Sequence, residues 1–306
     1  MNKSAETSGR SSFSKFMNND NTVGYIFAAP FIIGFLAFTL IPMCISFYYS
    51  FTNYKITKAP TWAGLNNYIT LLGDEHFWNS IKVTFEYVLF GVPSKLIAAL
   101  LIAMLLTHAK RMQGFYRAVY YIPSLIGGSV AVALVWKQMF SSTGPIVSMI
   151  QALGAEDFNF FGSTQYAFIP LVIGNAWQFG SSMLIFAAGL KQIPKDYYES
   201  AMIDGAGAVK RFFSITLPCL SPIILFNLIM QLISGFMTFT SAFIITEGGP
   251  NEATNYISLY IYNNAFSYHK MGYACALSWV MLVIITVVTL VVFKTSNKWV
   301  FYESEQ

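Results

Sequence analysis

Charged residues are scarce in this sequence. Only 10% of the 306 residues are Asp, Glu, Lys or Arg, while 55% are hydrophobic and 17% are aromatic. A soluble domain has about 25% charged residues. Because so much apolar surface has to face a medium other than water, the composition predicts a protein that lies in a lipid bilayer.

Residues that build catalytic and metal sites are also few. There are three histidines, far apart in the sequence, and three cysteines. Cys44, Cys219 and Cys275 lie in or beside apolar runs without a paired spacing, so we interpret them as small buried hydrophobic residues. Glycine-rich nucleotide-binding loops, zinc-binding histidine pairs and serine nucleophile motifs are missing too. The sequence predicts neither catalysis nor a cofactor or metal bound by this chain.

Long apolar runs dominate what is present. A helix needs roughly 20 apolar residues to cross about 30 Å of hydrocarbon, and it satisfies its own backbone polar groups. Six runs qualify: 24–51, 81–107, 118–139, 166–190, 216–245 and 272–293. The predicted fold class is therefore an all-α polytopic membrane protein with six transmembrane helices. We expect kinks at Pro93, Pro123 and the Gly127-Gly128 pair.

The same runs divide the chain into three parts. Residues 1–20 are polar and rich in Ser and Asn, which indicates a mobile tail. Residues 21–298 form the predicted transmembrane domain, and residues 299–306 form a C-terminal tail. The first apolar run starts late and lacks a clear cleavage site after it, so we interpret it as a retained helix.

Lysine and arginine are distributed unevenly between the two sides of the predicted bundle. One side has only Lys55, Lys58 and Lys270. The other side has Lys3, Arg10, Lys15, Lys110, Arg111, Arg117, Lys191, Lys195, Lys210, Arg211, Lys294 and Lys298. The positive-inside rule assigns the richer side to the cytoplasm, so both termini are expected there.

The loop at 191–215 is too polar for a plain connection between spans. Pro194 suits the first turn of a helix, and we predict a helix over 195–203, a break at Asp204-Gly205 and a second short helix over 206–213. Its small residues leave room for another surface to approach closely. Docking into a groove and a simple interfacial connection both fit this pattern.

The loop resembles the cytoplasmic EAA loop of binding-protein-dependent ABC importer permeases. The matching residues are Glu199-Ser200-Ala201, Asp204-Gly205-Ala206, Phe212, Ile215 and Leu217-Pro218. Ser200 departs from the family pattern, which has Ala there. The segments WAGLNNY at 62–68, VPSKLIAALLIAMLL at 92–106 and EGGPNEATNYISLYIYNNAF at 247–266 are similar to the carbohydrate-type permeases, above all the maltose and glycerol-phosphate "first" permease.

The resemblance implies a mechanism and a set of partners. The permease pairs with a second, homologous permease above two ATPase subunits, which bind ATP and Mg, in a prokaryotic cytoplasmic membrane. An extracytoplasmic binding protein delivers the substrate. Separately, the sequence has no basic patch interleaved with exposed aromatic residues, so we expect no nucleic-acid partner. The loop docks on an ATPase, and the implied coupling residues are Glu199, Ser200, Ala201, Asp204, Gly205, Ala206 and Phe212.

Polar residues inside the fourth and fifth spans are candidates for a transport path. Asn227, Gln231, Ser234, Thr238 and Ser241 recur at steps of three or four, which places them on one helix face. Asn175, Trp177, Gln178 and Ser182 lie on the fourth span. Amides and aromatic rings suit a sugar, whereas the alternative role for such residues is to hold helices together.

The predicted function is therefore the permease of a sugar or oligosaccharide importer. A glycerol-phosphate or polyol importer is the alternative substrate class, although Lys95 and Lys137 are the only bases within the spans. A self-sufficient secondary transporter should show inverted repeats or intramembrane acids, and Glu86 is the one candidate acid. A polytopic membrane enzyme would need an intramembrane nucleophile or metal set.

Overall fold

The computed structural model describes residues 20–108, 112–154 and 158–301. The predicted tail at 1–20 lies outside the described residues except for Asp20, and the predicted tail at 299–306 is described as far as Phe301. Within these ranges the chain is helical, and the β-structure consists of the isolated bridges Thr52–Trp62 and Lys55–Lys58. The prediction of an all-α membrane protein is confirmed.

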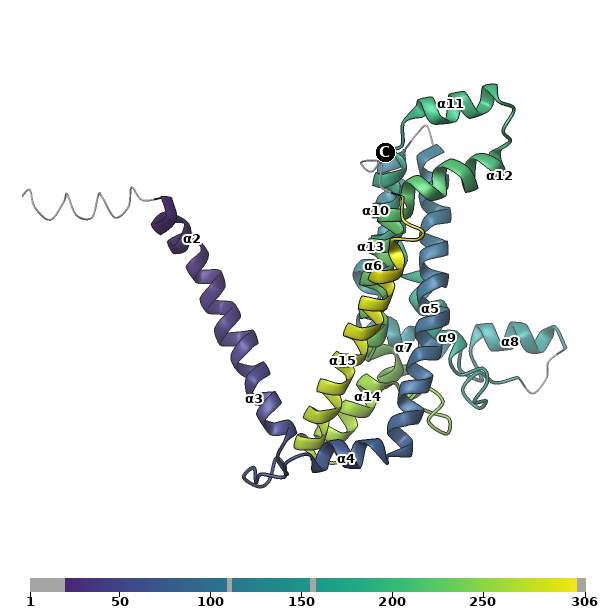
Figure 1. Cartoon of the computed structure of the whole chain (residues 1–306). Coiled ribbons are helices and arrows are strands. Elements are labelled where there is room, and N and C mark those ends of the chain that lie inside the picture. The colour runs from purple at the N-terminus through teal and green to yellow at the C-terminus, as the bar shows by residue number, and fades with distance from the viewer. Residues whose placement is uncertain (1–19, 109–111, 155–157, 302–306) are drawn as a thin grey trace, which may run out of the picture.

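Figure 1 shows the arrangement of the helices, in which four short π-helical segments (η) continue or join α-helices. In chain order they are α2 (Asp20–Phe35), η1 (Leu36–Leu40), α3 (Ile41–Ser50), α4 (Asn66–Leu72), α5 (Glu75–His108), α6 (Gln113–Ile126), α7 (Val130–Met139), α8 (Pro145–Ala152), α9 (Ile169–Trp177), α10 (Gly180–Leu190), α11 (Lys195–Ile203), α12 (Ala208–Arg211), η2 (Phe212–Thr216), α13 (Leu217–Phe236), η3 (Ala242–Thr246), α14 (Ile257–Tyr262), η4 (Asn263–Ser267) and α15 (Met271–Ser296).

The described ranges contain four helices that are long and apolar enough to cross a membrane, and six such spans when each of two bent helix pairs is counted as one. Two of the spans are the pairs α6–α7, bent by 94°, and α9–α10, bent by 46°. The four unbroken ones are Gly24–Ser50, Glu75–Thr107, Ala208–Phe236 and Met271–Ser296. The predicted number of spans is therefore observed, but the third and fourth are not continuous helices.

The observed kinks differ in part from those expected. The Gly127-Gly128 pair does separate α6 from α7, and the Ser129 hydroxyl caps α7 by accepting from the N–H of Val132 at 3.3 Å. Pro93 lies within the continuous helix α5, and Pro123 lies within α6. The fifth span ends at Phe236 rather than reaching residue 245, because the chain leaves the helix at Met237.

Helix α5 is the central element of the bundle, since it packs against α9, α10, α13 and α14. A β-carbon on Gly235 of α13 would lie 3.2 Å from Val88 and 3.3 Å from Val92 on α5, so this glycine lets the two helices approach closely. These valines belong to a buried core that also contains Phe186 of α10. The core fixes the relative positions of the spans around α5.

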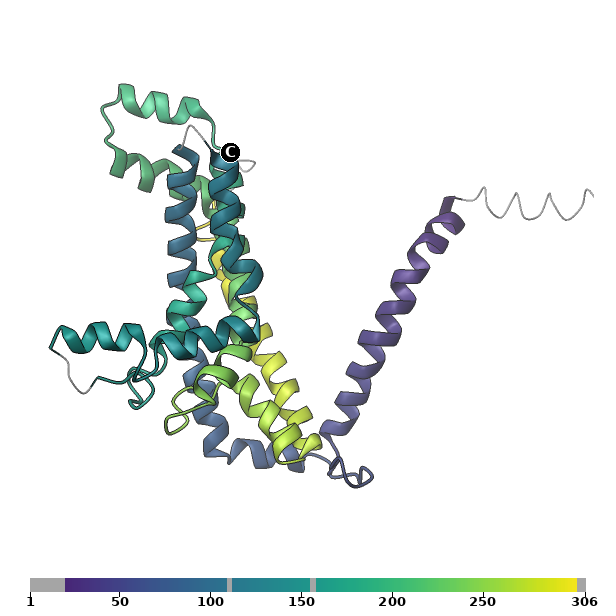
Figure 2. The same ribbon diagram turned by 180° about the vertical axis from the view of Figure 1, so that it is seen from behind.

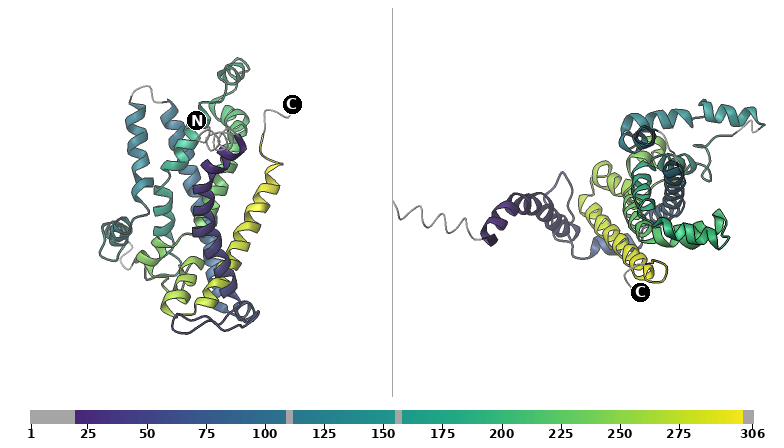
Figure 3. Two further views of the ribbon diagram at one scale, coloured as in Figure 1. Left: turned by 90° about the vertical axis from the view of Figure 1, so that its left-hand side faces the viewer. Right: turned by 90° about the horizontal axis from the view of Figure 1, so that it is seen from above.

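The segment α2–η1–α3 stands apart from the bundle except at one end, as Figures 1 and 2 show. Its apolar side chains are exposed, with Phe38 85% accessible. Helix α3 contacts α15, where the rings of Phe47 and Trp279 are 4.8 Å apart, and its last residue, Ser50, is hydrogen-bonded to α4. Seen from above, α15 is the bundle helix that lies beside it (Figure 3).

The two ends of the bundle carry different elements. Helices α11 and α12 project from one end, which we call the loop end, while α4 lies across the opposite end, which we call the α4 end (Figure 1). Helix α8 projects at an intermediate height, on the side away from α2–α3 (Figures 1 and 2). The bent spans α6–α7 and α9–α10 break between these two ends.

Candidate functional site

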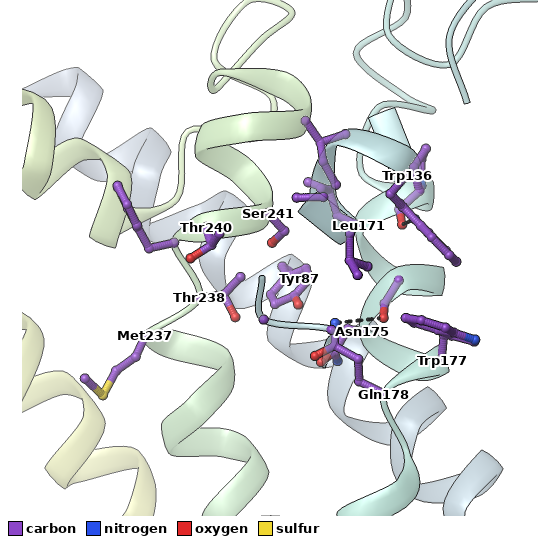
Figure 4. Close-up of a pocket in the computed structure, with 18 residues that line it drawn as sticks. Tyr87, Trp136, Leu171, Asn175, Trp177, Gln178, Met237, Thr238, Thr240 and Ser241 are labelled. Atoms are coloured by element: carbon purple, nitrogen blue, oxygen red, sulfur yellow. Dashed lines mark hydrogen bonds between the residues drawn. The ribbon is translucent and has the colours of Figure 1, made fainter. Parts of the chain in front are cut away.

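A cavity of about 250 Å³ lies where the bent spans and the end of the fifth span meet. It is lined by residues of α5, α7 and α9 and by the segment that follows α13 (Figure 4). The lining polar and aromatic residues are Tyr87, Trp136, Asn175, Trp177, Gln178, Thr238, Phe239, Thr240 and Ser241. The site is thus built at three breaks in helical structure.

The fourth span contributes three of the predicted path residues to this cavity. Trp177 ends α9, and Gln178 lies in the break before α10. The side-chain amide of Asn175 donates to the carbonyl oxygen of Gly91 on α5 at 2.9 Å, and that of Gln178 donates to Gly174 at 3.2 Å. The oxygen of each amide can accept a hydrogen bond, so both side chains can bind a hydroxyl group of a ligand.

The predicted stripe on the fifth span is divided by the end of α13. Thr238 and Ser241 lie beyond Phe236 and line the cavity. Asn227 is 1% exposed and donates to the Ile223 carbonyl of its own helix at 3.0 Å. The prediction of one continuous polar face over 227–241 is therefore wrong, because the helical register stops at residue 236.

Two more residues of the stripe also lie away from the cavity. The Gln231 amide donates to the Ser182 hydroxyl at 3.3 Å and so joins α13 to α10. Ser234 is exposed, and its carbonyl accepts from the Thr238 hydroxyl at 3.3 Å. Gln231 and Asn227 have the contacts of helix-packing residues, which was the alternative that the sequence left open.

Two cavity residues did not stand out from the sequence. Tyr87 lies in an apolar stretch of α5, and Figure 4 shows it between Thr238 and Asn175. Trp136 has the position of an interfacial aromatic residue, but its indole N–H donates to the Pro170 carbonyl at 2.8 Å, and its ring lies 5.5 Å from that of Trp177. No local pattern in the sequence marks either residue as part of a cavity, because both are placed there by contacts with other spans.

The chemistry of the lining is polar but uncharged. Among the described residues that line the cavity, none is Asp, Glu, Lys, Arg or His. Amides and hydroxyls can exchange hydrogen bonds with ligand hydroxyls, and indole faces can stack on the C–H groups of a sugar ring. Lys137 on α7 lies nearby in sequence, but its ammonium pairs with the Glu247 carboxylate at 2.9 Å.

The loop end has the predicted first helix and glycine turn, but the short second helix predicted over 206–213 is not separate, because α12 begins at Ala208 and continues through η2 into α13. Helix α11 spans Lys195–Ile203, and Gly205 has a φ of +76°, which only glycine adopts freely. The Ala206 N–H closes the turn on the Ala201 carbonyl at 2.8 Å. Glu199, Ser200 and Asp204 are exposed, and Ala201, Ala206 and Phe212 are half-buried. The implied coupling residues thus lie together on a protruding loop.

Apolar side chains at the tip of this loop are unusually exposed. Ile203 is 88% accessible and Val209 is 72% accessible. The loop is attached to the bundle by the Tyr198 hydroxyl, which lies 2.9 Å from the hydroxyl of Thr216 at the end of η2, within the fifth span. Exposed apolar residues on a polar loop are typical of an interface with another protein.

The carboxylate of Asp74, the residue before α5, connects several elements at the α4 end. Its carboxylate accepts hydrogen bonds from the hydroxyls of Tyr260 at 2.5 Å and Tyr273 at 2.6 Å, and from the N–H of His76 at 3.0 Å. Burial raises the pKa of Asp74, but the hydrogen bonds from the two tyrosines and from the backbone N–H groups of Phe77 and His76 outweigh it, and the net pKa is below its ordinary value. This carboxylate ties α5 to α14 and α15.

Comparisons with known proteins agree with this architecture. Residues 76–300 match the family model of binding-protein-dependent transport system inner membrane components. A probable ABC transporter permease protein of Bacillus subtilis, YesP, is 52% identical over 297 residues, which are 96% of each chain. The trehalose/maltose transport system permease protein MalF of Thermococcus litoralis is 33% identical over 263 residues, covering 85% of this chain and 87% of that one.

A solved structure has the same fold. It is a bacterial ABC transporter involved in the import of the acidic polysaccharide alginate, and one of its chains matches with a TM-score of 0.79 and 25% identity. The match covers 94% of this chain and 99% of that one. Bent helices around an uncharged cavity, the helix–turn–helix at the loop end and these matches lead to one assignment: the chain belongs to the family of binding-protein-dependent transport system inner membrane components.

Proposed function

We propose that the chain is the permease subunit of an ABC importer that moves a sugar or oligosaccharide across the membrane. The observation that carries this proposal is the cavity lined by amides, hydroxyls and aromatic rings. A glycerol-phosphate substrate is disfavoured, because the phosphate would need a cationic partner and the described lining offers none. The relative from Thermococcus litoralis, a trehalose/maltose permease, supports a carbohydrate.

The orientation and partners follow from the charges and from the family. The loop end and both termini face the cytoplasm, where Lys191, Lys195, Lys210 and Arg211 lie beside α11 and α12. A second, homologous permease completes the membrane path, and an extracytoplasmic binding protein delivers the sugar at the α4 end. Two ATPase subunits bind ATP and Mg below the loop end, and this chain binds no cofactor of its own.

Coupling passes through the loop end. Helix α11 docks in a groove of an ATPase subunit, with the apolar side chain of Ile203 as an anchor and Glu199 available to pair with a basic residue. Movement of α11 reaches the fifth span through the contact between Tyr198 and Thr216. Because that span ends beside the cavity, closure of the ATPases can change which side of the membrane the cavity opens to.

The test begins with purification of this chain from its membrane together with its stoichiometric partners. The complex is reconstituted in vesicles with its binding protein, and ATP hydrolysis and uptake are measured across neutral sugars, acidic sugars, glycerol phosphate and polyols. We expect stimulation by one saccharide class. Recovery as a homomer without an ATPase, or stimulation by glycerol phosphate alone, would contradict the proposal.

A further inference from the structure

The two bent spans contact each other at their breaks, and Ser124 lies at that contact. Its hydroxyl donates to the carbonyl oxygen of Gln178 at 3.0 Å and accepts from the N–H of Ser181 at 3.2 Å. Gln178 lies in the break between α9 and α10, and Ser181 lies in the first turn of α10. One hydroxyl on α6 therefore bridges the break in another span.

The Ser124 bridge satisfies backbone groups that the helix break would leave without hydrogen-bond partners. A helix that breaks inside a membrane leaves N–H and C=O groups without their helical partners, and lipid cannot supply replacements. Ser124 supplies both an acceptor and a donor at the break, so the bend of 46° is held by a side chain from α6. The position of Gln178 therefore depends on a residue that does not line the cavity.

Glycines make the contact between the two breaks tight. A β-carbon on Gly127 would lie 2.3 Å from Cδ and 2.4 Å from Cγ of Gln178. A β-carbon on Gly180 would lie 2.7 Å from the Tyr120 carbonyl oxygen. The Gln178 side chain is thus pressed along Gly127, and its amide nitrogen is held by the Gly174 carbonyl at 3.2 Å. Figure 4 shows Gln178 below Asn175 at the edge of the cavity.

We propose that Ser124 is a positioning residue that fixes Gln178 in the cavity and thereby sets which sugar hydroxyls the permease accepts. This rests on the proposed function, in which the cavity binds the transported sugar. Ser124 acts through the backbone of the break and does not touch the sugar. Without its hydroxyl the break relaxes, and the Gln178 amide loses the fixed direction that distinguishes one hydroxyl arrangement from another.

The test compares two sugars that differ in one hydroxyl, each presented on saturating binding protein to the reconstituted complex. For Ser124→Ala we expect the preference between them, measured as the ratio of uptake rates, to change about three- to tenfold, which corresponds to the loss of one neutral hydrogen bond between the Gln178 amide and the sugar. Ser124→Cys, which keeps a weak donor of similar volume, should have an intermediate ratio. Ser181→Ala is the matched control, because its exposed side chain is not part of the bridge, and it should keep the wild-type ratio.

A double-mutant cycle shows whether Ser124 acts through Gln178. Gln178→Ala alone should change the ratio, and adding Ser124→Ala should change it no further. Full additivity, a wild-type ratio in Ser124→Ala, or equal effects of Ser124→Ala and Ser181→Ala would overturn the proposal. If Ser124→Ala does not assemble, the ratio in Ser124→Cys decides, and a wild-type value there also overturns it. A wild-type complex that transports no sugar would instead remove the proposed function.

Discussion

At the scale of single residues, the polar side chains form two groups: some hydrogen-bond only in helix packing, and others are hydrogen-bonded and also face the cavity. Asn227 and Gln231 bond to groups within or between helices, so their polarity is used in packing. Asn175 and Gln178 use their amide nitrogens in the same way but have cavity-facing positions. A buried polar group is stabilising only when it is hydrogen-bonded. The positions of the Asn175 and Gln178 side chains at the cavity therefore depend on the backbone groups of the bundle to which their amides donate.

Asp74 provides a prediction at this scale. Because its folded-state pKa is lowered, its stabilising effect is present at neutral pH and is lost as the pH falls through that lowered value, below the ordinary carboxyl value of about 3.9. Asp74→Asn keeps an acceptor oxygen but removes its charge, so it should lower the stability of the complex at pH 7 by about 1 kcal/mol, the difference between hydrogen bonds to a charged and to a neutral acceptor at a site partly screened by water.

The measurement is the melting temperature of the purified complex as a function of pH. The difference between wild type and Asp74→Asn should shrink as the pH is lowered towards the point at which Asp74 is protonated in the wild type. Thr70→Ala serves as the control, because Thr70 is an exposed residue near Asp74 at the α4 end. Equal melting temperatures of wild type and Asp74→Asn at pH 7 would contradict the role given to the carboxylate.

At the scale of elements, helices with local signals were predicted well. The helix at 195–203 and the break at Asp204-Gly205 are observed because Pro194 and Gly205 determine backbone geometry by themselves. The break at Gln178 was not predicted, because neither glycine nor proline occupies positions 177–179. Its stabilising group comes from Ser124 on another span, which no local pattern could indicate.

Coupling provides a prediction for the α11 element. Tyr198→Phe removes the hydroxyl that contacts Thr216 and should leave the ATPases bound while reducing the sugar transported per ATP hydrolysed, by about three- to tenfold if one neutral hydrogen bond carries the coupling. Thr216→Val removes the other partner and should have the same effect. Uptake and ATP hydrolysis are measured on the same vesicles, and additive effects in the double variant would show that the two residues act separately.

At the scale of the whole molecule, the first membrane span packs against little of its own chain. The segment α2–α3 stays largely exposed, and none of its most apolar stretch is buried inside the chain. Such a helix is stable only in lipid or against another membrane protein. The single chain is therefore consistent with the proposed role as one subunit of a larger transporter.

The orientation of the whole molecule provides the last prediction. In membranes that contain this chain without its ATPase subunits, and in a variant whose three cysteines are replaced by serine, Ile203→Cys and Tyr268→Cys introduce single exposed thiols at the loop end and the α4 end. A membrane-impermeant maleimide should label only Tyr268→Cys in intact right-side-out vesicles and only Ile203→Cys in inverted ones. The reverse pattern would place the loop end outside the cell and contradict the proposed coupling.

The sequence alone determined that this is a membrane protein, how many spans it has and where its polar loop with a helix and a glycine turn lies. These properties follow from the length of apolar runs and from residues such as Gly205 whose effect is local. Tertiary structure decided which polar residues face the cavity. Asn227 and Thr238 were equivalent members of one stripe, but the end of α13 at Phe236 separates them. The break at Gln178 likewise depends on Ser124 from a different span, because an open backbone group in a bilayer is satisfied only by what the fold brings to it.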